Sequence, residues 1–92
     1  MTENSLQGQM AERRRAAAVL RGVEARFAAT VHRATGATVE VAWIGRDHFS
    51  ICTDTAHDLE TARGLLDQGF QLLDQQEYPE DDLYVAVYAV PS

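Results

Sequence analysis

The side chains best suited to catalysis or metal binding lie in one short stretch, residues 48–57, which holds His48, Ser50, Cys52 and His57. The first part of this stretch alternates like a β-strand, on which residues four apart are separated by about 13 Å. A cysteine nucleophile and its histidine base must approach to about 3 Å, so His48 and Cys52 do not form a dyad within one strand. His48 and Ser50, about 7 Å apart, are also too distant.

The remaining candidate ligands are not spaced as a metal site requires. His48 and His57 could join Asp54 or Asp58 around a metal only if the loop between them folded back. The single cysteine, Cys52, excludes an intramolecular disulfide. The sequence has no phosphate-binding or dinucleotide-binding glycine motif, no HExxH and no GxSxG. It therefore predicts no catalytic residues, no metal site and no cofactor, although a paired-carboxylate site among its many acids stays open.

The elements that would position these residues begin with a long helix. Residues 9–34 repeat apolar side chains at spacings of three and four, and Gly36 follows where a helix C-cap glycine belongs. The apolar stripe consists of Ala16, Leu20, Val23, Phe27, Val31 and Ala34. Residues 1–8 are polar and show little periodicity, which predicts a flexible N-terminal tail.

A β-hairpin is expected next. Residues 38–44 and 48–53 both alternate apolar with polar side chains. A three-residue loop pairs Trp43 with Phe49 and Val41 with Ile51, which keeps one face apolar, whereas a two-residue loop would mix the faces. This register makes Trp43 a core residue.

The second half of the chain predicts a helix and a last strand. Thr55 with an acid three residues later indicates a helix N-cap, and the apolar spacing that follows predicts a helix to about Glu77. Residues 83–90 predict the third strand. At 92 residues the chain makes one domain, residues 9–92, of the α+β class. Its order is α-β-β-α-β, with a three-stranded antiparallel sheet of order 2-1-3 and both helices on one face.

The last strand is apolar on both faces, unlike a strand that faces solvent on one side. Such a strand is either central or covered from both sides, and with three strands the missing cover could be a second chain. We therefore expect self-association through Tyr84, Ala86, Tyr88 and Val90. The alternative is that the tyrosines lie on a solvated sheet face.

Charge is distributed unevenly along the chain. The net charge is −6 with no lysine, yet residues 13–33 carry six arginines and one glutamate, a net charge of +5, and residues 36–92 carry −9. Two charged contact surfaces for a partner protein follow from this separation. The first is an arginine helix with Arg14, Arg21, Arg26 and Arg33, and the second is an acidic face with Asp67, Asp74, Glu80, Asp81 and Asp82.

These observations predict a small acidic, non-enzymatic protein-binding module of the adaptor or inhibitor type, which acts by surface complementarity as a homodimer. An inhibitor from a bacterial or phage mobile element that blocks a nucleic-acid-handling complex is a special case. One alternative is a nucleic-acid binder that uses the arginine helix, although the acidic remainder disfavours it. Another is a small enzyme or ligand-binding dimer with a pocket between the second helix and the sheet, near Tyr84 and Tyr88.

The location expected for this protein is the cytoplasm. The sequence has no run of 18 or more apolar residues, so no membrane contact is predicted. Its N-terminus lacks the apolar region of a secretory signal.

Overall fold

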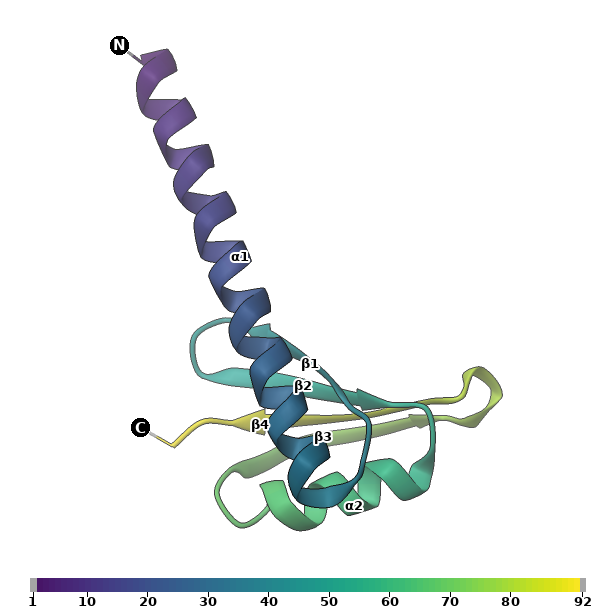
Figure 1. The fold of residues 1–92 in the computed structure, drawn as a ribbon. Helices are drawn as coiled ribbons and strands as arrows, with labels where there is room; N and C mark the ends of the chain where they lie inside the picture. The colour runs from purple at the N-terminus through teal and green to yellow at the C-terminus, as the bar shows by residue number, and fades with distance from the viewer. Residues whose placement is uncertain (1, 92) are drawn as a thin grey trace.

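The computed structural model describes residues 2–91, with helical side chains described from residue 11 onward except those of residues 12, 13, 16, 17 and 20. Within this range the chain is a small α+β domain with two α-helices and a four-stranded antiparallel sheet (Figure 1). The elements are α1 (Thr2–Thr35), β1 (Glu40–Ile44), β2 (His48–Thr53), α2 (Ala56–Leu66), β3 (Gln71–Tyr78), a 3₁₀ turn (Pro79–Asp81) and β4 (Leu83–Ala89). The predicted α+β class is confirmed.

The strands lie in the order β1-β2-β4-β3, each antiparallel to its neighbours. β2 and β3 therefore run parallel with β4 between them, and α2 connects them, which makes a split β-α-β unit. The prediction of a three-stranded sheet of order 2-1-3 is wrong, because the last strand pairs with β2 and β3 and not with β1. β4 is central, and this position explains why both of its faces are apolar.

The sequence predicts a second helix that runs to about Glu77, and this range includes most of β3, so the prediction lacks one strand. In the structure α2 ends at Leu66. The carbonyl oxygen of Leu66 accepts hydrogen bonds from the backbone N–H groups of Gly69 and Phe70 at 3.1 and 2.9 Å. Phe70 continues the helical spacing of apolar residues, but it does so from a turn. The spacing of apolar residues alone could not distinguish a continued helix from a turn after the helix.

β3 conceals its strand pattern for two reasons. A bulge at Leu73 shifts its register against β4 between Leu72 and Asp74, which interrupts the alternation. β3 also forms an edge of the sheet, and its residues after the bulge are polar on both faces. An edge strand without an apolar face carries no period-two signal.

The local signals elsewhere are confirmed. β1 and β2 pair Trp43 with Phe49 and Val41 with Ile51, which is the register of the three-residue loop. The hydroxyl of Thr55 accepts a hydrogen bond from the backbone N–H of Asp58 at 3.1 Å, as an N-cap does. Gly36 follows α1 with φ of +80°, a conformation that favours glycine.

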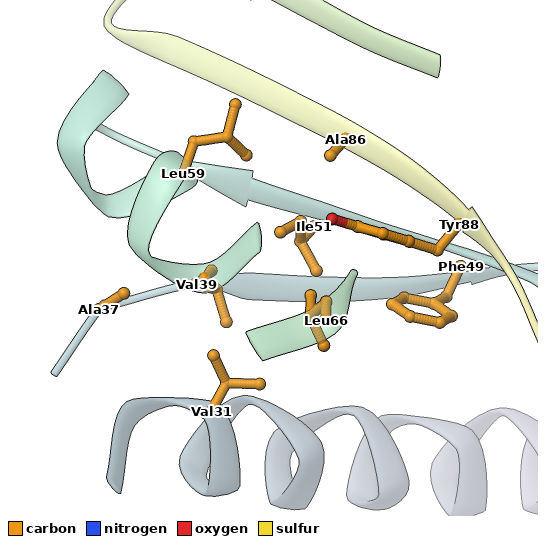
Figure 2. Packing of buried hydrophobic residues seen from close by; sticks show 10 residues of the cluster. Val31, Ala37, Val39, Phe49, Ile51, Leu59, Leu66, Ala86 and Tyr88 are labelled. Atoms are coloured by element: carbon orange, nitrogen blue, oxygen red, sulfur yellow. The ribbon is translucent and has the colours of Figure 1, made fainter. Parts of the chain in front are cut away.

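The core lies between the two helices and one face of the sheet (Figure 2). Val31 from α1 and Leu59 and Leu66 from α2 pack against side chains of β2 and β4, so both helices cover the same face. The buried residues are Val31, Ala37, Val39, Phe49, Ile51, Leu59, Ala62, Leu66, Ala86 and Tyr88. Phe27, Trp43 and Phe70 surround Phe49 with ring centroids 5.0–5.8 Å away.

α1 extends well beyond the sheet, and its N-terminal half stands clear of the rest of the molecule (Figure 1). The longest dimension of the molecule, 53 Å, is close to the length of about 50 Å expected for a helix of 34 residues. The helix begins at Thr2, earlier than the predicted residue 9. Flexibility of residues 1–8 stays a prediction, and the side chains of Ala16 and Leu20 lie outside the described set.

Two isoleucines on adjacent strands test which face of the sheet is the core. Ile51 is fully buried, whereas Ile44 is 48% exposed on the opposite face. We expect Ile51→Ala to lower the free energy of unfolding by about 2–5 kcal/mol through lost burial and a cavity. Ile44→Ala, the matched control, should cost less than about 1 kcal/mol. Urea unfolding measures both, and equal losses would contradict this orientation of the sheet.

Candidate functional site

In the part of the chain that the structure describes, both helices lie on one side of the sheet and no helix covers the other side, which we call the open face (Figure 1). Its centre is formed by β2 and β4, where Ser50 and Cys52 lie opposite Val87 and Val85. Ala42 and Ile44 extend this uncharged area onto β1, and Gln76 and Tyr78 lie on β3. The only acids that the strands place on this face are Glu40 on β1 and Asp74 on β3, so carboxylates flank an apolar and small-polar centre.

The candidate catalytic residues of β2 lie on this face without forming a dyad. His48, Ser50 and Cys52 lie opposite Ile44, Ala42 and Glu40 of β1, as the predicted register requires. Burial, and second the charge of Glu40, raise the pKa of the Cys52 thiol. A thiol held protonated is a poor nucleophile, which is consistent with a packing role for Cys52.

A second surface is the groove between α2 and β3, with a volume of about 440 Å³. Arg63 on α2 crosses it, donates one hydrogen bond to Gln75 of β3 and pairs with Asp67 at 3.1 Å. The other carboxylate oxygen of Asp67 accepts a hydrogen bond from the hydroxyl of Tyr88 at 2.7 Å. The sequence suggested a pocket between the second helix and the sheet near Tyr84 and Tyr88, but neither tyrosine lines this groove. Its polar side chains bind one another and connect α2 to β3 and β4.

The third surface is an apolar cavity of about 130 Å³, which we call the aromatic cleft. Phe27 of α1 and Phe70 form two of its walls, and most of its lining is half-buried. It is lined by Phe27, Val41, Trp43, Phe49, Phe70 and Val90. The backbone N–H of Trp43 donates to the carboxylate of Glu24 at 2.9 Å, which connects the edge of β1 to α1 beside the cleft.

The residues expected to mediate self-association face the core of their own chain and not a second chain. Tyr84, Ala86, Tyr88 and Val90 lie on the helix-covered face of β4, and Ala86 and Tyr88 have no exposed surface. They contact the helices of their own chain, so we correct that assignment. The side of β4 on the open face is formed instead by Leu83, Val85, Val87 and Ala89.

The predicted acidic residues do not form one surface. Asp67 is engaged with Arg63 and Tyr88 on the helix side, and Asp74 lies opposite Val87 on the open face. Glu80, Asp81 and Asp82 lie at the tip of the β3–β4 hairpin. The carboxylates are thus distributed over three regions of the domain.

The arginine helix is exposed as the sequence suggests. Arg14, Arg21, Arg26 and Arg33 are all exposed on α1. Among the described side chains the only ion pair is Arg63–Asp67, so these four arginines have no carboxylate partner within that set.

In the described part of the chain, no three histidine, cysteine or acidic side chains gather as they would around a metal ion. No helix within the described range is long and apolar enough to cross a membrane. Comparisons with protein-family models, curated proteins and solved structures find no match to this chain.

The aromatic cleft and the extent of the open face were not expected from the sequence. The sequence places Phe70 in a helix and Val90 in a contact strand, and only the β3–β4 hairpin brings them together with Trp43. The apolar character of β4 on both faces was the signal in the sequence that could have indicated a fourth strand. A strand that is apolar on both faces requires a partner strand on each side.

The buried hydroxyl of Tyr88 predicts instability at alkaline pH. Burial and the adjacent Asp67 carboxylate raise the pKa of Tyr88 above its ordinary value of 10.0. Above about pH 10 the unfolded chain loses this proton while the folded chain keeps it, so the free energy of unfolding should fall by up to about 1.4 kcal/mol per pH unit. Tyr88→Phe should remove this dependence of the free energy of unfolding on pH.

Urea unfolding across pH 8–11.5 measures the slope for each variant. The matched control is Tyr78→Phe, at an exposed tyrosine, and an unchanged slope in Tyr88→Phe would contradict the prediction.

The half-buried Cys52 thiol should react slowly with a disulfide reagent. Because burial and Glu40 raise its pKa, a disulfide reagent at pH 8 should modify it more slowly in the folded chain than in urea. Glu40→Gln should increase the folded-state rate by removing a like charge. Glu80→Gln, at the hairpin tip, is the control. Equal rates for Glu40→Gln and the unmodified chain would show that Glu40 does not act on the thiol.

Proposed function

We propose that this chain is a small acidic protein-binding module, non-enzymatic and of the adaptor or inhibitor type, that works as a homodimer. Its surface for the partner protein is the open face of the sheet. The observation that carries this proposal is the lack of cover over the centre of that face, where the side chains of Cys52, Val85 and Val87 are only half-buried.

The shape and chemistry of the open face support a protein partner over a small substrate. A sheet face is broad, whereas enzyme sites are concave and gather a few convergent polar groups. Its exposed large apolar side chains, Ile44, Tyr78 and Leu83, come from three different strands. Ile44 lies at the end of the face near the β1–β2 loop, Tyr78 and Leu83 lie at the other end, and the half-buried Val85 and Val87 lie between them. Exposed apolar surface of this kind marks contact sites in proteins.

The charges on the open face indicate the kind of partner surface that fits it. Glu40 and Asp74 flank the apolar centre from the two edge strands. A partner with an apolar strip bordered by lysine or arginine would bury that centre and pair with both carboxylates. Such rim pairs mainly influence specificity and association rate, so binding should weaken as salt rises.

The single cysteine provides a direct test. A photo-crosslinker attached to Cys52 lies at the centre of the open face. In extracts of the cells that encode the protein, irradiation should link it to one partner protein, and the yield should fall with salt. Val87→Glu places a charge beside Cys52 and should reduce the yield at least about tenfold, because an unpaired carboxylate is then buried.

The matched control is Gln76→Glu, which adds the same charge on β3 at the side of the same face. Its crosslinking yield should stay within about threefold of the unmodified chain, as expected for a rim position. Crosslinking that Val87→Glu leaves unchanged, or that never captures a second protein species, would contradict the proposal. Retention of DNA or RNA at low salt that is lost on replacing Arg14, Arg21 and Arg26 would favour the nucleic-acid alternative.

A further inference from the structure

The helix layer is incomplete at one end of the sheet. α2 packs over the other end, where it lines the groove with Gln75 and Glu77 of β3. At the end near the β1–β2 loop, where the N–H of Val90 donates to the carbonyl of Asp47, Phe27 of α1 and Phe70 flank the aromatic cleft. The aromatic cleft at this end has a volume of about 130 Å³, which is room for one apolar side chain of a further element.

α1 crosses the strands steeply and projects past the β1 edge of the sheet, on the side of the β1–β2 loop (Figure 1). The described residues between positions 14 and 22 are Arg14, Arg15, Ala18, Val19, Arg21 and Gly22, and all are exposed. Helical structure in proteins is stabilised mainly by packing of an apolar face, and this half of the helix has no such packing at the described positions. The molecule thus has an uncovered helix and an unfilled apolar cleft next to each other.

We propose that the projecting half of α1 from a second copy of this chain lies in the aromatic cleft. The protein is then a two-fold symmetric dimer in which each copy supplies the other's missing helix. This inference rests on the homodimer of the proposed function and adds which surfaces meet. The open face of each copy stays free for the partner protein.

An apolar ridge connects the cleft to the projecting half of α1. Phe27 forms part of the cleft wall, Val23 one turn earlier is half-buried, and Val19 another turn earlier is 63% exposed. Residues four apart lie on one side of a helix, so the three form a continuous ridge. The cleft of about 130 Å³ is nearly large enough for benzene, which fills an apolar cavity of about 150 Å³ elsewhere. Val19 of the second copy fits this space.

Charge complementarity favours a second copy as the occupant. Residues 13–33 carry a net charge of +5 and residues 36–92 carry −9. Within one chain, Arg14 and Arg15 of the projecting half are exposed and form no ion pair among the described side chains. In the dimer, Arg14 and Arg15 of one copy approach the acidic domain of the other, where opposite charges attract across the interface.

The proposed arrangement is compatible with two-fold symmetry. An isologous contact requires that the helix and the site it fills belong to the same surface patch. Here they adjoin at Val23 and Phe27, so an antiparallel pair of α1 helices places each projecting half across the partner's cleft. The contact closes on itself and produces a dimer without further growth.

The single tryptophan, Trp43, lines the cleft and reports on its occupancy. We expect light scattering of the full chain to give twice the mass of one copy. On dilution the mass should fall, and Trp43 emission should shift to longer wavelength with the same midpoint, because the indole becomes exposed. Added salt should move that midpoint to higher protein concentration.

Two substitutions on α1 separate this interface from a general effect of charge. Val19→Asp should raise the dissociation constant of the dimer roughly a hundredfold, because symmetry introduces two buried carboxylates. Ala18→Asp adds the same charge about a quarter turn away and should change the constant by less than about fivefold. Circular dichroism of each variant confirms that the helix content is retained.

Three results would overturn the inference. These are a chain that stays monomeric at millimolar concentration, a dimer that Val19→Asp leaves intact, and a dimer that Val87→Glu on the open face dissociates instead. A monomer would leave the cleft to a helix of another protein. Failure here is distinct from failure of partner binding, because the Cys52 crosslink to a second protein is measured independently.

Discussion

The apolar character of β4 on both of its faces is the constraint on which the rest of the structure depends. A strand of this kind must have a strand on each side and cover above it, so β2 and β3 flank it and the helices pack over Ala86 and Tyr88. β3 is then an edge strand, and its polar residues face solvent. The opposite side of β4, with Val85 and Val87, is left at the centre of a face that the chain does not cover.

Incomplete cover is the common property of the two surfaces that we consider functional. Two helices lie over the core, but α2 has only 11 residues and α1 directs its N-terminal half away from the sheet. The aromatic cleft and the open face are left uncovered because the two helices cover only part of the sheet. A small chain buries a limited fraction of its apolar surface, and association with another chain is the usual means of burying more.

The polar network under α2 pairs the buried hydroxyl of Tyr88, although the buried Nε of Arg63 in the same network has no hydrogen-bond partner among the described residues. Tyr88 is fully buried, yet its hydroxyl reaches the carboxylate of Asp67, which Arg63 holds from the helix. A residue that composition alone would place on an acidic binding surface thus helps to hold α2 against the sheet. Side-chain chemistry indicates a role only when its neighbours are known.

The sequence by itself determined the local features: the long helix α1, the β1–β2 register, the Thr55 cap and the Gly36 cap, because each depends on residues close together in the chain. It did not determine β3, the strand order or which side of β4 is buried. Helical spacing ran on from Leu66 through Phe70, the bulge at Leu73 broke the alternation, and both sides of β4 are apolar. Only the tertiary structure could decide these points. The orientation of β4 is set by the helices that pack on it, and the aromatic cleft forms only where α1, β1 and the β3–β4 hairpin meet.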